Sequence, residues 1–473
     1  MATEPTNAVA PTPAATNPAV PGVSPAVEAE TAEAAADPGP LANPAGDPAK
    51  AAPVREYTWR DAELRNPPLR LLNAVGAGLR RLRLDRPALS PEKVVAAAQA
   101  RARAQFGADD LGSASYREPL ERYLAAAAAE ADLTTFGRLL VTRMLANALV
   151  NRIALHAWTT AHPEIRSEQI ESPWIIVGLP RTGTSLLSIL LGLDPLSRPL
   201  RQWEAAHPIP PPTLETAAED PRIAQSAREL GQLLRLNPAL GAMHPFGATV
   251  AEECIALFMY DLRTLGIETQ AHVPSYGRWL ETTDMTPAYA QHKLALQAFQ
   301  SAQPTGHWVL KSPNHLWCLP TLLAAYPDAR VIWTHRDPAP VVTSLASLNN
   351  AAQRPLTSRT DPRPTAEEWK GKARRAISAA MAFDTDNPPG WCVHVRYDQL
   401  MADPVGAVAS LYERSGLTVH ELHARRMRAW LAQVPQDAHG RHRYTPTDFG
   451  WTYPQLTTEF ADYTTRYAVP TET

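Results

Sequence analysis

The chain has few cysteines and no excess of positive charge. Its 473 residues include three cysteines, Cys254, Cys318 and Cys392, and no two of them stand in a CxxC pair. An odd, sparse set of this kind predicts neither a disulfide framework nor a zinc site, and it favours a reducing compartment. The formal net charge of −3 argues against a general nucleic-acid-binding protein, because such proteins carry a basic excess.

Long apolar runs are also missing from the sequence. No stretch of about 18 uncharged apolar residues occurs, so we expect no membrane-spanning segment. The N-terminus has neither a basic region nor an apolar region of the kind found in signal peptides. These absences together predict a cytoplasmic protein. The most apolar stretch, residues 123–158, is interrupted by five charged residues, Glu130, Asp132, Arg138, Arg143 and Arg152.

The composition divides the chain into three regions. Residues 1–55 contain 11 of the 46 prolines and no aromatic residue, which predicts a disordered tail because such a segment buries too little apolar area. Residues 56–170 carry alanine, leucine, arginine and glutamate at helical spacing, which predicts a helical region packing on the core. Residues 171–473 form the third region, and we expect a helical insert for the acceptor at about 205–300.

Short apolar runs appear from residue 172 onward and alternate with helical patterns. Such alternation is typical of a parallel sheet that helices cover on both faces. The predicted fold class is therefore α/β, with a P-loop-type three-layer core and an additional N-terminal helical region. The expected strands are Trp174–Val177, Trp308–Leu310, Val331–Thr334 and Cys392–Val395.

The sharpest feature of the sequence is the loop GLPRTGTS at residues 178–185, between an expected strand and an apolar helix. Backbone N–H groups in such a loop and at a helix N-terminus can bind a phosphate. The two glycines match the Walker A pattern, but Thr184 stands in the lysine position. Without that lysine the contact to the β- and γ-phosphates of ATP is lost. Arg181 supplies a cation inside the loop instead.

At these residues the chain resembles the 3'-phosphoadenosine 5'-phosphosulfate (PAPS)-dependent sulfotransferases, in their bacterial form related to the tyrosylprotein and carbohydrate enzymes. The loop resembles their 5'-phosphosulfate loop, where many bacterial members carry arginine as Arg181 does here. A second block, residues 329–344, resembles their 3'-phosphate block. Arg336 follows a strand and Ser344 stands eight residues later, at the two matching positions. The resemblance spans residues 172–467 and leaves out the first 170.

The resemblance implies a soluble sulfotransferase that moves a sulfuryl group from PAPS to an acceptor hydroxyl. Each sulfuryl oxygen carries less charge than a phosphoryl oxygen, so we expect no metal. The segment around Tyr397 is similar to the one that helps to hold the adenine, and residues 440–450 are similar to a late loop that covers the cofactor. The expected donor-binding residues are Arg181, Thr182, Gly183, Thr184, Ser185, Arg336, Ser344, Tyr397 and Arg443.

Transfer to a hydroxyl needs a base for the acceptor proton and a cation at the departing oxygen. The resemblance implies that Lys311, together with Arg181, stabilises the bridging oxygen. For the base we favour Glu204, which lies 23 residues after Arg181, close to the position of the glutamate in the tyrosylprotein enzymes. His315 is the second choice, because cytosolic members place a histidine soon after the matching lysine. A third option is the pair Glu252 and Glu253.

Two other functions remain open at this point. A P-loop kinase or NTPase would need the missing lysine and a Walker B aspartate, and a non-catalytic scaffold would not need Arg181, Lys311, Arg336 and Ser344 together. The sequence does not choose among small-molecule, lipid and sugar acceptors. Aromatic residues in the insert favour a ring-containing acceptor if they line a pocket, whereas in most proteins such residues belong to the core.

Overall fold

The computed structural model describes residues 56–81, 88–243, 246–433 and 441–472. The predicted tail, residues 1–55, lies outside the described residues. The centre of the fold is a five-stranded parallel sheet with the strand order β3-β4-β2-β5-β6. The strands are β2 (Trp174–Val177), β3 (Ser197–Pro199), β4 (His307–Lys311), β5 (Arg330–His335) and β6 (Cys392–Arg396).

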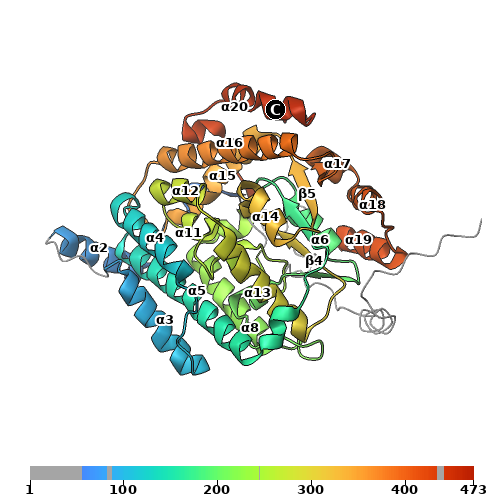
Figure 1. The fold of residues 1–473 in the computed structure, drawn as a ribbon. Coiled ribbons are helices and arrows are strands. Elements are labelled where there is room, and N and C mark those ends of the chain that lie inside the picture. Colours follow the sequence, from blue (N-terminus) through green and yellow to red (C-terminus); the bar gives the residue numbers. More distant parts are fainter. Residues whose placement is uncertain (1–55, 82–87, 244–245, 434–440, 473) are drawn as a thin grey trace, which may run out of the picture.

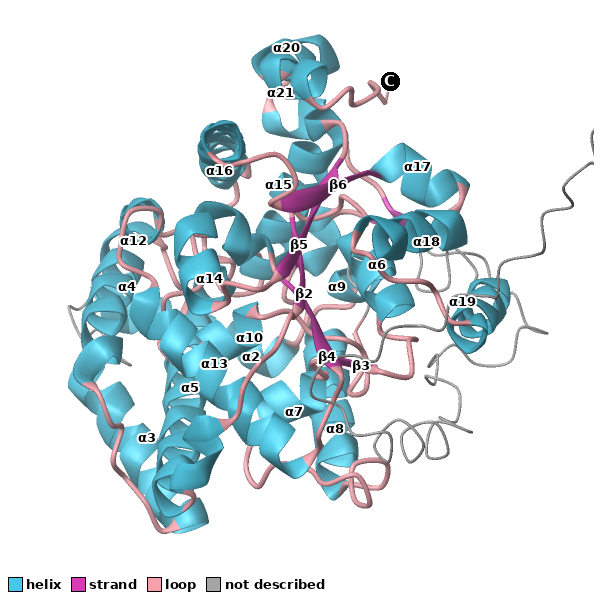
Figure 2. Ribbon diagram, turned by 45° about the vertical axis from the view of Figure 1, so that its right-hand side comes forward, coloured by secondary structure: helices cyan, strands magenta, loops and turns pink. Residues whose placement is uncertain are grey.

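The central strand β2 is apolar on both faces because both faces are covered. Trp174 and Ile176 pack into one apolar cluster with α6 (Thr184–Leu191), α18 (Pro404–Arg414) and α19 (Glu421–Gln433). Ile175 and Val177 point to the opposite face and belong to the larger core. Figure 2 shows the strands in the middle, with α13 and α14 on one side and α6, α18 and α19 on the other. The predicted α/β class with helices on both faces is confirmed.

The N-terminal helices form a separate layer at one end of the molecule (Figure 1). The longest helix, α5, is capped at its N-terminus by Thr134, whose side chain accepts a hydrogen bond from the N–H of Gly137. Arg152 on α5 makes a fully buried ion pair with Asp261 at 3.3 Å, which joins this layer to the insert. The helices are α2 (Pro67–Arg81), α3 (Pro91–Phe106), α4 (Arg117–Glu130) and α5 (Thr135–Ala161).

The remaining helices surround the sheet. Among the described residues, no helix is both long and apolar enough to cross a membrane. The helices of the insert are α7 (Gln202–Ala206), α8 (Pro221–Leu236), α9 (Ala239–Met243), α10 (Ile255–Phe258), α11 (Leu265–Glu268), α12 (Pro274–Leu280) and α13 (Thr286–Ala302). After it come α14 (Leu319–Ala325), α15 (Pro338–Gln353), α16 (Arg363–Asp386), α17 (Tyr397–Ala402), α20 (Tyr453–Glu459) and α21 (Ala461–Arg466).

A short second sheet ties the two ends of the described chain together. Strand β1 (Glu56–Tyr57) pairs in parallel with β7 (Arg441–His442). The 3-10 helix η1 (Trp59–Ala62) follows β1 and packs against α15. Helix α15 itself begins directly after β5, where Asp337 caps it by accepting a hydrogen bond from the N–H of Ala339. The segment that precedes the helical layer therefore reaches the elements that follow the sheet.

Candidate active site

The glycine-rich loop follows β2 and leads into α6 at the carboxyl edge of the sheet. Gly178, Arg181 and Gly183 have φ values of 144°, 70° and 89°, so the loop passes through the left-handed region three times. A Cβ at Gly178 would lie 2.4 Å from the Oγ1 of Thr334, so only glycine fits there. Arg181 is not a glycine, and a positive φ at such a residue costs about 1 kcal/mol or more, as often found at ligand sites.

The two ends of the loop have different surroundings. The hydroxyl of Thr182 is buried. It donates a hydrogen bond to the Leu179 carbonyl at 2.7 Å and lies 2.6 Å from the Thr334 hydroxyl. Its side chain therefore fixes the loop to β5 instead of facing a ligand. Thr184 and Ser185 open α6 and are partly exposed, next to the backbone N–H groups that the helix leaves without intrahelical partners. This end of the loop suits an anion.

Arg336 lies beside the loop, as its place after β5 requires. Its Nη1 donates to the carbonyl oxygen of Arg181 at 2.8 Å, and its guanidinium stacks 4.0 Å from the ring centre of Tyr397. The structure thus brings Arg181, Arg336 and Tyr397 together, although they come from three separate segments. Ser344 is buried two turns into α15.

The outer side of Arg336 is occupied by a carboxylate. Nε and Nη2 donate to the two oxygens of Glu472, each at 2.7 Å, in a bidentate ion pair. The N–H of Glu472 donates to Asp337 at 2.7 Å, so the segment is fixed at two points. A planar guanidinium binds carboxylate and phosphate with the same paired geometry. Arg336 is therefore already arranged to bind an anionic group. No sequence pattern indicated Glu472.

Lys311 ends β4, and its ammonium group is almost fully buried. Nζ lies 3.0 Å from Oε1 of Glu253, which comes from the insert. The Lys311 carbonyl accepts a hydrogen bond from the N–H of Cys254 at 2.9 Å, and this bond holds the glutamate segment against the strand. A buried cation and a carboxylate thus meet at the carboxyl edge of the sheet, which is the edge that carries the loop and Arg336.

The carboxylate of Glu204 lies in a different environment. Oε1 accepts a hydrogen bond from Nη2 of Arg198 at 2.9 Å, and Oε2 accepts one from the N–H of Arg201 at 3.1 Å. The side chain is buried, and it caps the short helix α7. Both oxygens are therefore held inside the fold.

His315 is also buried, in a cluster of aromatic rings. Its Nδ1 lies 2.8 Å from the hydroxyl of Tyr289, and the ring contacts Phe258 and His292. Burial lowers the pKa of His315 from 6.5 to about 3. Phe258, Tyr260 and Tyr276 of the insert are equally buried, so these rings belong to the core and do not line an acceptor pocket.

The late loop approaches the site through a histidine. Nε2 of His442 lies 2.7 Å from the hydroxyl of Ser347 on α15. Burial, and after it the positive charge of Arg181, lowers the pKa of His442 to about 4. Arg443 instead forms an ion pair with Glu56 of β1. Among the described contacts of this loop, His442 therefore faces α15, and Arg443 faces β1.

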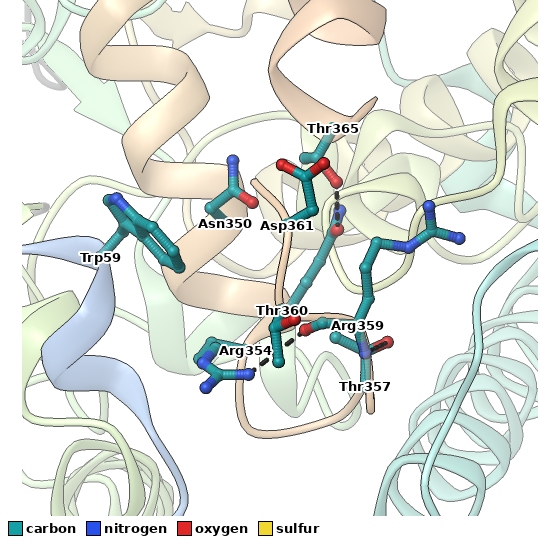
Figure 3. A pocket seen from close by; sticks show the side chains of 9 residues that line it. Trp59, Asn350, Arg354, Thr357, Arg359, Thr360, Asp361 and Thr365 are labelled. Atoms are coloured by element: carbon teal, nitrogen blue, oxygen red, sulfur yellow. Dashed lines mark hydrogen bonds between the residues drawn. The ribbon is translucent and has the colours of Figure 1, made fainter. Parts of the chain in front are cut away.

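A small polar cleft lies at the far end of α15 (Figure 3). Helix α15 has 16 residues and so spans about 24 Å, which separates this cleft from Arg336 at the other end. The cleft is distinct from the predicted donor site. It is lined by Trp59, Asn350, Gln353, Arg354, Thr357, Arg359, Thr360, Asp361 and Thr365.

The fold and this constellation define an α/β protein with a glycine-rich loop suited to an anion and, beside it, an arginine already paired with a carboxylate. A family model described as the sulfotransferase family matches residues 173–421, which is more than half of the chain. The chain therefore belongs to the sulfotransferase family.

Two solved mycobacterial structures are similar over most of their length. Sulfotransferase STF1 from Mycobacterium tuberculosis H37Rv has a TM-score of 0.70 at 31% identity, over 79% of this chain and 98% of that one. Sulfotransferase STF9 from Mycobacterium avium has a TM-score of 0.73 at 29% identity, over 82% and 99%. Residues 172–467 alone could not supply this coverage, so the likeness extends into the N-terminal helical region.

Two curated relatives match a shorter part of the chain. Both are omega-hydroxy-beta-dihydromenaquinone-9 sulfotransferases Stf3, from Mycobacterium bovis and Mycobacterium tuberculosis, and both are 28% identical over 130 residues. The match covers 26% of this chain and 32% of each relative, so the chain spans about a third of the length of the curated relatives it matches.

Proposed function

We propose that the chain transfers a sulfuryl group from PAPS to the hydroxyl of an acceptor. The observation that carries this proposal is that Arg336 contacts both the phosphate loop and Tyr397. Its Nη1 donates to the Arg181 carbonyl at 2.8 Å, and its guanidinium lies 4.0 Å from the ring centre of Tyr397. A donor with phosphates at both the 3' and 5' positions of one nucleoside needs two anion sites this close together. A kinase or NTPase has no corresponding support, because Thr184 replaces the lysine.

The residues present suit such a donor. The N–H groups at the start of α6, with Thr184 and Ser185, would hold the 5' side, and Tyr397 would lie against the adenine. The 3'-phosphate would replace the Glu472 carboxylate on Arg336, since both anions accept paired hydrogen bonds from one guanidinium. Ser344 is buried on α15, so we base the 3'-phosphate site on Arg336.

For the chemistry we favour Lys311 and Glu253. In the transfer, the bond from sulfur to the bridging phosphate oxygen breaks and a bond from sulfur to the acceptor oxygen forms. Lys311 would neutralise the charge that develops on the bridging oxygen. The carboxylate of Glu253, 3.0 Å from the ammonium group, would accept the proton of the acceptor hydroxyl. Arg181 would contribute a second cation on the loop.

Glu253 is preferred over the two bases that the sequence favoured. Glu204 is 2% exposed, with one oxygen on Arg198 and the other on the Arg201 N–H, whereas the Glu253 side chain is 19% exposed and better placed to meet an acceptor. His315 has a pKa of about 3 and is a poor proton acceptor near neutral pH. Glu253, in contrast, is already beside the proposed catalytic lysine.

For the acceptor we favour a small molecule of the lipid class. The name of the Stf3 relatives describes transfer to a hydroxylated menaquinone derivative. We further propose that the reaction takes place in the cytoplasm, without a nucleic-acid partner and without a metal in the transfer step.

Binding of adenosine 3',5'-bisphosphate tests the donor site. Calorimetry without magnesium should show binding by the full chain, and Arg336→Ala should weaken it by about 30-fold, the effect of about 2 kcal/mol for a charge-assisted pair. Arg103→Ala is the matched control, because Arg103 is an exposed arginine on α3 that pairs with Asp109 and should change the affinity less than about 2-fold. A preference for magnesium-ATP over the bisphosphate would contradict the proposal.

A further inference from the structure

Three metal-binding side chains converge at the edge of the sheet, away from the donor site. Cys392 and His394 stand two residues apart on the edge strand β6, so their side chains lie on the same face. Asp384 reaches them from the last turn of α16. Nε2 of His394 lies 3.5 Å from the sulfur of Cys392 and 3.6 Å from Oδ1 of Asp384. One donor atom from each of the three lies within 4.8 Å of the others.

These separations fit ligands that share one tetrahedral ion. Zinc binds sulfur at about 2.3 Å and nitrogen or oxygen at about 2.0–2.2 Å. At a tetrahedral angle these bond lengths place sulfur and nitrogen about 3.5 Å apart, and nitrogen and oxygen about 3.4 Å apart. The two separations that involve His394 agree with these values to within about 0.2 Å. A thiolate, an imidazole and a carboxylate form a donor set that suits zinc.

Outer hydrogen bonds orient the histidine ligand. Nδ1 of His394 lies 2.8 Å from Nε2 of His335, and Nδ1 of His335 lies 2.9 Å from the hydroxyl of Tyr463. When each histidine donates from Nδ1, Nε2 of His394 keeps its lone pair and faces Cys392 and Asp384. Metal-binding histidines are usually held by such a second hydrogen bond.

The carboxylate of Asp384 is held in the same way. Its Oδ2 accepts hydrogen bonds from Arg466 and Tyr467, each at 2.8 Å. Its Oδ1 accepts one hydrogen bond, from Nε1 of Trp391 at 2.8 Å, and retains a second lone pair toward the cluster. The side chains of His394 and Asp384 are 35% and 13% exposed, so solvent has access to a fourth position.

We propose that Asp384, Cys392 and His394 bind one zinc ion per chain, with water as the fourth ligand. The ion would join α16 to β6. Through His335 it would also support the end of β5, directly before Arg336. The spacing of cysteines alone indicated no zinc site, because only one ligand is a cysteine and the aspartate comes from a different element.

Zinc titration of the reduced full chain tests the site. We expect one equivalent per chain by equilibrium dialysis, and a thiolate-to-metal charge-transfer band when cobalt(II) replaces zinc. Cys392→Ser and His394→Gln should each weaken zinc binding by more than about 100-fold, and His335→Gln by about 10- to 100-fold. Cys318→Ser is the control, since this buried thiol lies outside the cluster and its loss should leave binding unchanged.

The proposal is overturned if the chain binds no stoichiometric zinc, or if binding survives both Cys392→Ser and His394→Gln. A variant that fails to fold is identified by circular dichroism, and the other variant then decides. Bisphosphate affinity is measured on the same samples. It reports on the donor site separately, so loss of zinc binding and loss of the proposed function are distinguishable.

A second, independent observation concerns helix α2, whose apolar side faces solvent. Leu71, Val75 and Leu79 recur every four residues and are 67%, 56% and 37% exposed. The inward side carries Leu69, Leu72, Gly76 and Ala77 and is tied to α5 by two hydrogen bonds: Asn73 accepts from the N–H of Phe136 at 2.9 Å, and Arg80 donates to Thr135 at 3.2 Å. The helix therefore presents a second apolar stripe on its solvent side, where a surface helix is usually polar.

The charge of α2 indicates what this face would meet. The helix contains three arginines, Arg70, Arg80 and Arg81, and no acidic residue. Arg70 and Arg81 are exposed, beside the apolar stripe. An exposed apolar stripe flanked by arginine is typical of helices that lie on a membrane surface and bind anionic headgroups.

We infer that the α2 face docks on an anionic lipid surface. This inference rests on the lipid acceptor proposed above, because an apolar acceptor would be collected from a membrane. Leu71, Val75 and Leu79 would enter the interface, and Arg70 and Arg81 would contact headgroup phosphates. The exposed apolar stripe would then be buried in the working state of the protein.

Sedimentation with vesicles of phosphatidylcholine, with and without phosphatidylglycerol, tests this surface. The full chain should bind the anionic vesicles, and Leu71→Gln combined with Val75→Gln should weaken binding by at least about 10-fold. Leu214→Gln is the control, since Leu214 is also an exposed leucine (49%) but lies in the insert.

Equal vesicle binding by wild type and the α2 double variant would overturn the inference. So would concentration-dependent self-association that the double variant abolishes, because the face would then be an interface between two copies. Bisphosphate affinity should be the same in both proteins. A wild-type chain that binds no bisphosphate would instead contradict the proposed function.

Discussion

The ion pair between Arg336 and Glu472 leads to a prediction about donor affinity. If the 3'-phosphate binds to Arg336, it must displace the Glu472 carboxylate, because the same Nε and Nη2 groups already donate to it at 2.7 Å. Glu472→Gln removes the competing charge while keeping a side chain of similar size. We therefore expect this variant to bind adenosine 3',5'-bisphosphate more tightly than wild type.

The size of the effect follows from the exposure of the pair. A charge-assisted hydrogen bond contributes about 1.5–3 kcal/mol when it is well protected. The side chains of Arg336 and Glu472 are 17% and 37% exposed, so solvent screens the pair and the contribution falls toward about 1 kcal/mol. A change of about 1 kcal/mol corresponds to about 5-fold in the dissociation constant.

Calorimetric titration of wild type, Glu472→Gln and Glu413→Gln measures this difference at low and high salt. Glu413 is an exposed glutamate on α18 and serves as the control. The advantage of Glu472→Gln should shrink as salt screens the ion pair. Unchanged or weaker binding by Glu472→Gln would refute the idea that the two anions share Arg336.

Three further predictions concern catalysis and stability. Lys311→Ala should lower kcat by at least about 100-fold, with a smaller effect on donor affinity, because its charge acts on the departing oxygen. Glu253→Gln should lower kcat by about 100-fold or more in a sulfate-transfer assay. Glu204→Gln should instead lower the free energy of unfolding in urea by about 3 kcal/mol, because it breaks the buried ion pair with Arg198. The free energy of unfolding should fall as pH decreases from 6.5 to about 4, by up to about 1.4 kcal/mol per pH unit for each buried histidine. His315, for example, has a pKa of about 3 when folded and 6.5 when unfolded, so in this range only the unfolded chain binds the proton.

The corresponding controls use the same measurements. Lys293→Ala, on the partly exposed side of α13, should leave kcat unchanged. If Glu204→Gln rather than Glu253→Gln abolishes turnover while the protein stays folded, the choice of Glu253 as base is wrong. His315→Asn should reduce the pH dependence of unfolding between pH 6.5 and 4, and an unaltered slope would show that other groups produce it.

Part of the fold was predictable because local sequence decides it. Four short apolar strands and a loop with two glycines define a parallel sheet with an anion site at its carboxyl edge. The loop can be recognised because Gly178 and Gly183 occupy conformations that other residues rarely adopt. Arg336 could also be assigned, because a residue directly after a parallel strand must lie at that same edge.

Other assignments depended on how distant side chains pair. Glu204 stands at a suitable distance along the sequence, but Arg198 lies within reach and binds it, and this pairing depends on β3 and α7 packing together. Glu253 was a minor candidate in the sequence, and only the approach of the insert to β4 places it 3.0 Å from Lys311. The local sequence does not indicate which carboxylate forms an ion pair with which cation.

The sequence by itself therefore determined the family, the sheet, the phosphate loop and the arginine after β5, because each depends on residues that are close along the chain. Only the tertiary structure decided that Glu472 binds Arg336, that His315 belongs to the core, and that Asp384 meets Cys392 and His394. These outcomes depend on contacts between elements far apart in sequence, and such contacts are set by packing and burial rather than by local pattern.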